Sequence, residues 1–472
     1  MVHDVVIVGA GPVGLFLAVE LATAGVRPLV VERLVEPDQG IKAAAVGAVG
    51  VEALERRGFA RALEEAQVTM PMAKAARAGV GPVRRPGGHF SALFVIDQDL
   101  QPDPERHSRM VPQEALERIL AARADELGIE IRRGVEVEDF EQDGDGVTVR
   151  TSAGTLSAKY LVGCDGGRSR VRKLAGFAFP GTDPTITGYQ ALVEFDAPDK
   201  LANGWQRTPR GLITSIPGRV FTAEFDGPPP DRDAPITRAE VEASIRRVSG
   251  TDVGIRSMTK ATRWSDHARQ ATSYRLGRVL LAGDAAHVHS PFGGQGLNLG
   301  LVDAANLGWK LAAAVRGRDH LLDSYTAERH PVGARVLENT RAQVALMRPD
   351  PLTTALRAIV SELIELPEGN RHIGGMLSGV GTRYDLGDDD PLVGTLVKDR
   401  LLTLADGTEE RLYALARNGG GLLVSPSARS LPHHVRHAHT KEGPSTLIRP
   451  DGCVAWTEAS STSLDQALTR WF

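Results

Sequence analysis

The chain has 472 residues, of which 42% are hydrophobic and 24% charged, a composition typical of a globular protein with a sizeable core. A formal net charge of -4 without a polybasic run argues against nucleic-acid and membrane-surface binding, and no apolar stretch reaches the ~18 residues of a transmembrane helix. Cys164 and Cys453 are the only cysteines, which argues against disulfides or a zinc site and indicates a reducing, cytoplasmic location.

The first 32 residues predict a βαβ unit with a glycine-rich turn. An apolar strand over residues 4–8 leads into GAGPVG, a helix follows over residues 12–24, and a strand over residues 26–31 ends at Glu32. Gly9 permits the tight turn, Gly11 lets a pyrophosphate approach the backbone, and Gly14 lets the helix pack on the strand. Glu32 suits the hydroxyls of an adenosine ribose. A tight turn without a ligand is the weaker alternative in this complete context.

The next part of the chain leads to a second acidic strand end. The pattern predicts helices over residues 52–57, 60–66 and 112–127, a loop over residues 80–88, and strands over residues 129–133, 135–142, 147–151 and 160–163. Asp165 follows the last strand, in the sequence GCDGGRSRVRK. The cations Arg168, Arg170, Arg172 and Lys173 either form a solvated helix face, the favoured interpretation, or attract the phosphate of a dinucleotide.

Residues 179–266 have a different, β-rich character. Short β-type runs over residues 188–195, 211–216 and 219–225 are separated by prolines, and one helix is predicted over residues 238–248. This pattern indicates an inserted, mainly antiparallel sheet domain.

The sequence RVLLAGDAAHVHSPFGGQGLNLG, residues 278–300, predicts a third strand, loop and helix. The strand over residues 278–282 leads to Asp284, a glycine- and proline-rich loop covers residues 289–296, and a helix opens at Leu297. The backbone N–H groups of such a helix start favour a negatively charged group. An ordinary βα turn with a surface acid is the alternative.

The remainder predicts helices and then a small mixed unit. Helical patterns cover residues 324–329, a segment from Pro331 to residue 347, and residues 352–366, and a glycine-rich connection covers residues 369–381. Beyond residue 384, strands are predicted over residues 422–425, 446–449 and 454–457, with a closing helix over residues 463–471.

The three glycine-rich motifs, in this order, resemble those of the FAD-dependent aromatic hydroxylases, or class A flavoprotein monooxygenases. The branch acting on aromatic polyketides and rifampicin is the most similar. The resemblance implies an α/β fold with a Rossmann-like (GR2-type) FAD-binding domain over residues 1–178 and 267–380. It also implies a mainly antiparallel β-sheet substrate domain over residues 179–266 and a thioredoxin-like domain over residues 381–472, which lacks a CxxC pair and hence a thiol redox role.

The resemblance also implies a reaction. NAD(P)H, a transient co-substrate, reduces bound FAD, O₂ adds to give a C4a-hydroperoxyflavin, and one oxygen passes to the ring of a bulky aromatic, polyketide-type small molecule. Baeyer–Villiger insertion or epoxidation on the same scaffold, a non-oxygenating flavin dehydrogenase, and a non-enzymatic binder stay open as alternatives. No nucleic-acid or membrane partner is expected, and the protein is expected to be a monomer or homodimer.

The family's cofactor-binding positions can be matched individually. Glu32 is expected at the adenosine ribose with Arg33 near the adenine, Gln113 at the ribityl chain, and the backbone of Val137 at the adenine. The expected FAD contacts are Gly9, Gly11, Val13, Gly14, Glu32, Arg33, Lys42, Gln113, Val137, Asp165, Asp284, Gly296, Leu297 and Asn298. Pro291, Gly293 and Gly294 are expected to line the oxygen site. His287 and His289 are expected to be structural, so no catalytic side chain is assigned.

Two positions depart from the family pattern. Lys42 stands where an arginine usually contacts FAD, and Val49 stands where a second arginine is usual, within a run of small apolar residues. A lysine keeps the charge but loses the bidentate fork. A tunnel enlarged for a bulky substrate and drift without consequence are both open. On the substrate side, Tyr189, Gln190, Trp205, Arg207 and His267 are candidates, each better explained as a packing or surface residue.

Overall fold

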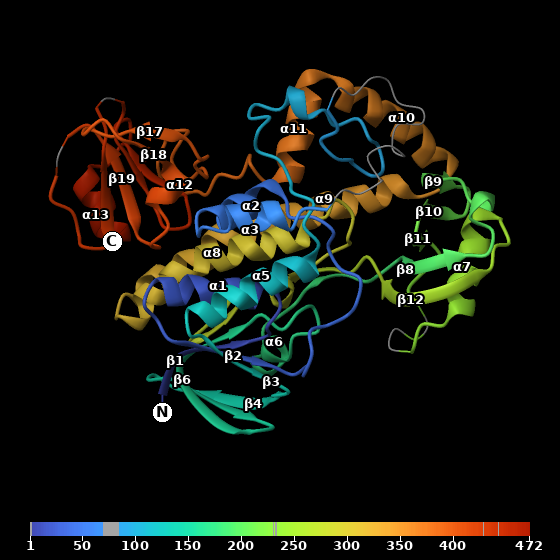
Figure 1. The fold of residues 1–472 in the computed structure, drawn as a ribbon, viewed down its shortest axis with the longest axis horizontal. Helices are drawn as coiled ribbons and strands as arrows, with labels where there is room; N and C mark the ends of the chain where they lie inside the picture. Colours follow the sequence, from blue (N-terminus) through green and yellow to red (C-terminus); the bar gives the residue numbers. More distant parts are fainter. Residues whose placement is uncertain (1, 69–84, 230, 232–233, 428, 442) are drawn as a thin grey trace.

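The structure is a computed structural model that describes residues 2–68, 85–229, 231, 234–427, 429–441 and 443–472. Figure 1 shows a central α/β body with a β-rich part at one end, coloured green, and a smaller part that carries the C-terminus at the other. Within the described residues, no helix is both long enough and apolar enough to cross a membrane. Of the loop predicted over residues 80–88, residues 80–84 lie outside the described residues.

The central body contains a mainly parallel sheet with the strand order β14-β15-β6-β1-β2-β3, and the hairpin β4–β5 extends it from β6. Val8 at the end of β1 lies beside Val31 of β2 and Gly163 of β6, and Leu281 of β15 lies beside Gly163. The carboxyl ends of these four strands therefore meet at one edge. The strands are β1 (Val2–Val8), β2 (Pro28–Glu32), β3 (Glu130–Arg133), β4 (Val137–Gln142), β5 (Val147–Thr151), β6 (Gly154–Gly163), β14 (Arg275–Leu276) and β15 (Val279–Leu281).

Helices α8, α1 and α5 cover one face of this sheet (Figure 1). A Cβ atom at Gly308 would lie only 2.5 Å from the Cβ of Glu20, so a glycine on α8 permits the close packing of α8 on α1. The predicted first strand, helix and second strand are confirmed as β1, α1 and β2. The helices of the central body are α1 (Pro12–Thr23), α2 (Ala48–Glu55), α3 (Ala60–Glu65), α5 (Gln113–Glu126), α6 (Arg170–Leu174) and α8 (Gly296–Val315).

The β-rich part is an antiparallel sheet, as the sequence predicts. Its strand order is β12-β8-β11-β10-β9, and strands β9 and β12 were not expected. Helix α7 (Arg238–Ser249) packs on one face, where Ile213 and Val220 lie against Val241 and Ile245. The opposite face is thus free to border the central body. Its strands are β8 (Thr187–Phe195), β9 (Gly204–Thr208), β10 (Gly211–Ile216), β11 (Arg219–Glu224) and β12 (Ile255–Trp264).

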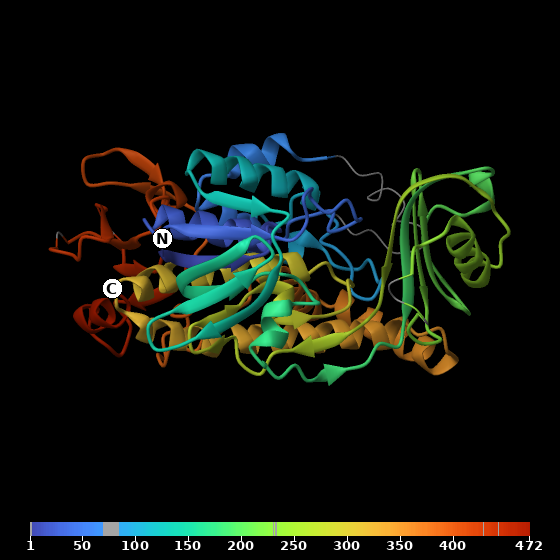
Figure 2. The same cartoon turned by 90° about the horizontal axis from the view of Figure 1, so that it is seen from below.

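Two helices differ from the sequence-based expectation. Helix α9 (Asp323–Met347) continues through Pro331, because its buried neighbours Glu328 and Arg329 anchor this turn by ion pairs with other elements. Figure 2 shows α9 running from the central body toward the β-rich part. The connection predicted over residues 369–381 is wrong. It forms helix α11 (Pro367–Ser378), which follows α10 (Pro351–Glu365).

Tertiary contacts explain why this glycine-rich segment is helical. The buried amide of Asn370 donates hydrogen bonds to the carbonyl oxygens of Val95 (2.8 Å) and Ile364 (3.1 Å). Gly379, with a φ of 76°, ends the helix in the left-handed conformation. These contacts outweigh the low helix propensity of glycine.

The C-terminal part contains a four-stranded sheet with the order β20-β19-β21-β22. Strand β19 is parallel to β20 and antiparallel to β21, and β21 is antiparallel to β22. The closing helix α13 (Leu464–Trp471) begins with a capping box formed by Ser463 and Gln466. The strands are β19 (Gly421–Ser425), β20 (Val435–His439), β21 (Thr446–Ile448) and β22 (Val454–Thr457), preceded by the pair β17 (Leu401–Thr403) and β18 (Glu409–Arg411).

Candidate active site

A cavity of about 1950 Å³ opens at the carboxyl edge of the central sheet and extends to the free face of the β-rich sheet. The sequence-predicted cofactor residues line it, with the exception of Gly14. These lining residues are Gly9, Gly11, Val13, Glu32, Arg33, Lys42, Gln113, Val137, Asp165, Asp284, Gly296, Leu297 and Asn298. Pro291, Gly293 and Gly294 line it as well. The fold therefore brings together residues separated by almost 290 positions.

The first glycine turn has the geometry that its sequence predicts. Gly9 has a φ of 109°, a conformation that strongly favours glycine. A Cβ atom at Gly14 would overlap the carbonyl oxygen of Gly9, which explains why Gly14 serves packing and does not reach the cavity. No atom lies within 4 Å of the position that a Cβ at Gly11 would occupy. The space beside Gly11 is therefore open to a ligand.

Two helices start at the cavity without a side-chain cap. Gly11 precedes α1 and Gln295 precedes α8, and neither helix start has a side-chain hydrogen bond to its first backbone N–H groups. Such uncapped N–H groups and the positive end of the helix dipole favour an anionic ligand. The cavity thus offers two anion-favouring positions, at Gly11 and at Gly296.

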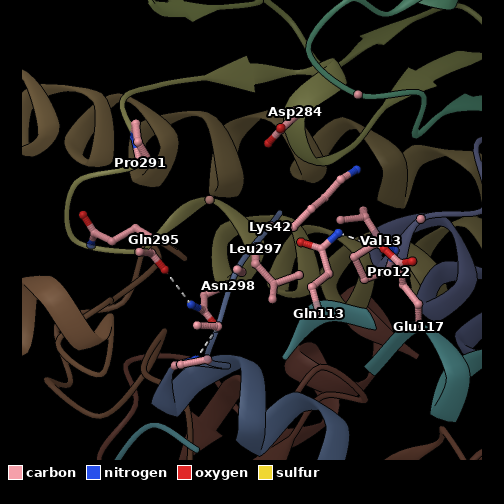
Figure 3. Close-up of a pocket in the computed structure, with 18 of the residues that line it drawn as sticks. Pro12, Val13, Lys42, Gln113, Glu117, Asp284, Pro291, Gln295, Leu297 and Asn298 are labelled. Atoms are coloured by element: carbon pink, nitrogen blue, oxygen red, sulfur yellow. Dashed lines mark hydrogen bonds between the residues drawn. The ribbon is translucent and has the colours of Figure 1, made fainter. Parts of the chain in front are cut away.

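The three acids at the strand ends have different environments. The carboxylate of Glu32 accepts hydrogen bonds from the backbone N–H groups of Ala10 and Leu34, both at 2.9 Å, so its orientation toward the cavity is fixed. Asp165 accepts from the backbone of Arg170 (2.6 Å) and thereby caps α6, and burial raises its pKa. Asp284 is exposed to the cavity and points into it (Figure 3). Asp284 is therefore available to a ligand.

A buried ion network supports the loop that carries Asp284. Asp303 of α8 accepts a hydrogen bond from the backbone N–H of Gly283 (3.1 Å) and lies 2.6 Å from Nε2 of His287. Nε of Arg329 donates to its other oxygen (2.7 Å). Burial would raise the pKa of Asp303, but Arg329 and His287 outweigh it and hold that pKa below its usual range. His287 is structural, and Asp303 and Arg329 were not foreseen, although Asp303 is a single acid within an apolar helix.

His289 borders the cavity in a neutral form. Its Nδ1 lies 2.7 Å from the carbonyl oxygen of Ser290, which places the proton on Nδ1. Its Nε2 is buried and has no hydrogen-bond partner among the described residues. Burial lowers the pKa of His289. Nε2 is therefore an acceptor available to a ligand and brings no positive charge.

The loop before α8 is held from both sides. Gly293 and Gly294 have φ values of 83° and 61°, and Nδ2 of Asn298 donates to the carbonyl oxygen of Gly294 (3.0 Å). The same Asn298 side chain accepts from the backbone N–H of Gly47 at 2.6 Å (Figure 3). Gln295 donates to the carbonyl oxygen of Met376 on α11 (3.0 Å). This loop is therefore a fixed wall of the cavity.

Lys42 and Val49, the two residues that differ from the family pattern, lie in different environments. Lys42 lines the cavity and forms an ion pair with Asp38 at 2.7 Å. Val49 is buried, packs against Gly379 and does not line the cavity. The reason is that α2 begins at Ala48, which turns Val49 away from the cavity and leaves its neighbours to line it.

The β-rich sheet closes the other side with a row of side chains from all five strands. Its register aligns, in order, Thr262, Gln190, Phe221, Thr214 and Trp205. All five line the cavity. Two of the predicted substrate-side candidates, Gln190 and Trp205, therefore lie in the cavity wall.

Aromatic rings dominate this wall. Phe221 stacks on Trp264 at 5.0 Å between ring centroids, and Phe292 from the loop before α8 meets Trp264 edge-on at 5.4 Å. The other candidates point elsewhere. Tyr189 donates to Glu240 (2.7 Å), Arg207 donates to Thr354 (2.8 Å), and His267 does not line the cavity. The sequence did not single out Phe221 or Trp264, because only the strand register reveals that they share a face.

Comparison with known families agrees with this geometry. A family model described as FAD binding domain matches residues 2–340, and one described as aromatic-ring hydroxylase, C-terminal, matches residues 390–472. The chain belongs to the FAD-dependent aromatic hydroxylases. This class A flavin monooxygenase therefore uses FAD as its cofactor.

Individual relatives match this hydroxylase over nearly its whole length. It is 40% identical to the 12-dehydrotetracycline 5-monooxygenase/anhydrotetracycline 6-monooxygenase of Streptomyces rimosus, over 100% of this chain and 99% of the relative. It is 38% identical to the rifampicin monooxygenase of Streptomyces venezuelae, over 99% of this chain and 98% of the relative. The solved structure of an aromatic hydroxylase from angucycline biosynthesis matches with a TM-score of 0.89 and 35% identity, over 100% of this chain and 99% of that one.

The residues present fit FAD. The open space at Gly11 and the uncapped start of α1 suit a pyrophosphate, and the fixed carboxylate of Glu32 suits ribose hydroxyls. The uncapped start of α8 suits a flavin ring that becomes negatively charged on reduction.

Proposed function

We propose that this hydroxylase oxidises a bulky polycyclic aromatic molecule with NAD(P)H as electron donor and O₂ as oxidant. The observation that carries the proposal is the wall of the β-rich sheet with its aromatic rings, which lies opposite the cofactor-binding residues in a cavity of about 1950 Å³. Ligand pockets commonly have volumes of ~300–1,000 Å³, so this cavity has room for FAD and a multi-ring substrate together. The relatives named for anhydrotetracycline and rifampicin support a substrate of this size.

In this proposal, each residue of the site holds or shapes one part of the FAD site. Glu32, Arg33 and Val137 would hold the adenosine half of FAD, and Gly11 and Val13 would hold its pyrophosphate. Asp284, Lys42 and Gln113 hold the ribityl chain and phosphates, with Gly9, Asp165 and Gly14 shaping the site. Bound FAD would supply the redox chemistry, namely electron uptake from NAD(P)H and activation of O₂.

The protein's contribution at the reacting end is positioning and electrostatics. The start of α8, at Gly296, Leu297 and Asn298, would stabilise negative charge on a bound flavin ring. Pro291, Gly293 and Gly294 would line the path of oxygen and the substrate, and no atom lies within 4 Å of the position that a Cβ at Gly294 would occupy. The rings of Phe221, Trp264 and Phe292 exclude water and orient the substrate.

The domain limits form part of the proposal. Residues 1–178 and 267–380 form the FAD-binding domain, residues 179–266 the substrate domain, and residues 381–472 a thioredoxin-like domain. The order of β20, β19, β21 and β22, with one parallel and two antiparallel pairings and a final helix, supports the last assignment. The lack of a CxxC pair in the sequence makes a structural role its expected one.

The experiment that tests the proposal is NAD(P)H oxidation by the purified protein. We expect a yellow, FAD-containing protein whose NADH or NADPH oxidation accelerates when a polycyclic phenol such as anhydrotetracycline is added. A protein that cannot be loaded with FAD would contradict the proposal. So would a rate of NAD(P)H oxidation that rises with single-ring phenols but not with polycyclic phenols. The product's NMR spectrum then distinguishes ring hydroxylation from Baeyer–Villiger insertion and epoxidation.

A further inference from the structure

The turn next to His89, a residue that lines the cavity, has an unusual backbone conformation. The backbones of Phe90 and Leu93 hydrogen-bond to each other in both directions, at 3.0 and 2.8 Å, so that Ser91 and Ala92 form the two-residue turn between them. These two residues have φ values of 55° and 58°, and among the described residues no others except glycines have a positive φ. Such a turn normally contains Asn-Gly or Gly-Gly, because other residues adopt this conformation at a cost in free energy. Strained conformations of this kind persist only where the surrounding structure holds them, and they cluster at functional sites.

Two helices hold this turn in place. The side-chain oxygen of Gln343 on α9 accepts a hydrogen bond from the backbone N–H of Ser91 (3.1 Å), and Oγ of Ser91 donates to the carbonyl oxygen of Gln343 (3.2 Å). Nη1 of Arg357 on α10 donates to the carbonyl oxygen of Ser91 (2.5 Å). Ser91 itself is fully buried. The turn is therefore a fixed support for His89.

The same turn fixes the proton of His89 on one nitrogen. The backbone N–H of Ala92 donates a hydrogen bond to Nδ1 of His89 at 3.2 Å. Since a backbone N–H can only donate, Nδ1 is the acceptor and the proton of the neutral ring is on Nε2. Burial, together with the nearby charge of Arg357, lowers the pKa of His89 from 6.5 to about 4, so the ring is neutral at pH 7. Nε2–H is thus an uncharged hydrogen-bond donor with a fixed direction.

This donor is accessible from the cavity. His89 lines the cavity and is partly exposed. Its Nε2 forms no hydrogen bond with a described residue, and it is not among the polar atoms that are completely buried without a partner. His289, which is also neutral, presents an acceptor at its Nε2. The two histidines therefore offer opposite hydrogen-bonding groups to a ligand.

His89 lies at one edge of the wall that the β-rich sheet forms. Its ring centroid is 5.3 Å from that of Trp205, which is on the edge strand β9. At the opposite edge, Oγ1 of Thr262 on β12 accepts a hydrogen bond from the backbone N–H of Ile41 (3.0 Å), next to the cofactor-binding candidate Lys42. A flat molecule that lies across the sheet therefore has one end at His89 and the other on the side of Lys42.

We propose that Nε2–H of His89 binds a carbonyl oxygen of the substrate's ring system and thereby determines which way round the substrate lies on the wall of the β-rich sheet. This inference rests on the proposed function and adds a chemical requirement to it, namely a ketone, quinone or amide oxygen at the end of the substrate next to β9. A carbonyl oxygen only accepts hydrogen bonds, so it matches a group that only donates. A methylene group in its place would leave Nε2–H without a partner once the substrate has displaced water.

The test uses the FAD-loaded protein and two three-ring phenols, 2-hydroxyfluorenone and 2-hydroxyfluorene, which differ only by a carbonyl group in place of a methylene group. We expect the ketone to bind about 5- to 10-fold more tightly, the range for one uncharged hydrogen bond. Titration followed by the change in flavin absorption measures both dissociation constants. The infrared carbonyl stretch of the bound ketone, labelled with ¹³C, should also lie at a lower frequency than in an apolar solvent, because a hydrogen bond weakens the C=O bond.

Two substitutions separate the donor from the support of the turn. His89→Asn keeps an acceptor near the position of Nδ1 for the N–H of Ala92 but places no donor at Nε2, so it should lose both the preference for the ketone and the infrared shift. His89→Gln places an amide N–H₂ near the position of Nε2 and should retain part of both effects. His372→Asn, at an exposed position of α11 that does not line the cavity, is the control and should behave as the wild type does.

The outcomes distinguish this inference from the proposed function. Equal binding of ketone and methylene compound by the wild type would overturn the role of His89. So would an unchanged preference for the ketone in His89→Asn, or an equal loss of that preference in His372→Asn. Binding of neither compound would instead contradict the proposed polycyclic substrate class, and with it the inference that rests on it.

Discussion

At the scale of single residues, the site depends on polar groups that have been left available for a ligand. Asp284 is exposed to the cavity, Glu32 is oriented by two backbone N–H groups, and Nε2 of His289 has no described partner. Buried or oriented polar groups that lack a protein partner are unfavourable unless a ligand or water completes them. Their grouping around one cavity indicates that the protein is completed by its cofactor.

Replacement of Asp284 by alanine should weaken FAD binding. We expect the dissociation constant of FAD to rise about 10- to 100-fold, because hydrogen bonds that the charged carboxylate accepts are lost. Fluorescence titration of the FAD-free protein measures this change. Asp145→Ala, which removes an exposed acid from the turn between β4 and β5, is the matched control and should bind FAD normally. Unchanged binding by Asp284→Ala would show that this acid does not contact the cofactor.

The buried Asp303 should make the free energy of unfolding depend on pH in the acidic range. Its pKa is below the unfolded value, so it stabilises the fold above pH ~4, and this contribution is lost as the pH falls below that value toward the folded pKa. Asp303→Asn leaves Arg329 without its acid and should lower the free energy of unfolding by about 3–5 kcal/mol at pH 7. Urea unfolding between pH 7 and pH 3 should show a weaker acid dependence in this variant than in the wild type. The same slope in both proteins would contradict the assignment.

At the scale of elements, the starts of α1 and α8 define the cofactor side of the cavity. Both helices begin without a side-chain cap. Helix α1 follows a glycine turn at the end of the parallel strand β1, and α8 follows the loop that contains Gly293 and Gly294. Gly11 and Gly14 serve this arrangement in different ways. The space beside Gly11 is open, whereas a Cβ at Gly14 would overlap the backbone of Gly9.

Alanine substitutions should separate these two roles. Gly11→Ala should leave the melting temperature of the FAD-free protein nearly unchanged but weaken FAD binding, because its methyl group enters the space of the ligand. Gly14→Ala should lower the melting temperature even without FAD, by several degrees, since α1 must move away from the turn. Thermal unfolding with and without FAD measures both effects. A loss of stability in Gly11→Ala that matches the loss in Gly14→Ala would contradict the separation.

The sequence predicts these elements well because the signals are local. The glycine turns, the strand-end acids Glu32 and Asp284, and most helix limits follow from residues close together in the chain. Helix α11 could not be predicted, because contacts of Asn370 with Val95 and Ile364 determine it. The row of cavity-lining side chains on the β-rich sheet also escaped prediction, since it depends on the register of five strands.

At the scale of the whole molecule, a buried ion cluster joins the C-terminal part to the central body. Arg449 lies 2.7 Å from Glu328 of α9 and 2.6 Å from Asp451, and Lys310 of α8 lies 2.8 Å from Glu328. Burial would raise the pKa of Glu328, but Arg449 and Lys310 outweigh it and lower that pKa. Glu328 is adjacent to Arg329, which supports the cofactor loop through Asp303. The C-terminal part is thereby linked to the site without lining the cavity.

Removal of Arg449 should loosen this connection. Arg449→Ala leaves the buried Asp451 without its ion-pair partner and Glu328 with Lys310 alone, and we expect the free energy of unfolding to fall by about 3–5 kcal/mol. Limited proteolysis should release the C-terminal part faster than in the wild type. Arg436→Ala, at an exposed position of β20, is the control and should behave as the wild type does. Equal proteolysis rates for Arg449→Ala and wild type would contradict the proposed link.

The central claim is that this flavin enzyme transfers oxygen from O₂ to an aromatic ring held against the β-rich sheet. The most direct measurement is turnover of a polycyclic phenol under ¹⁸O₂ with NAD(P)H, followed by mass spectrometry of the product. The account predicts a product that is heavier by one labelled oxygen atom. A product that forms with NAD(P)H oxidation but contains no label would contradict the claim.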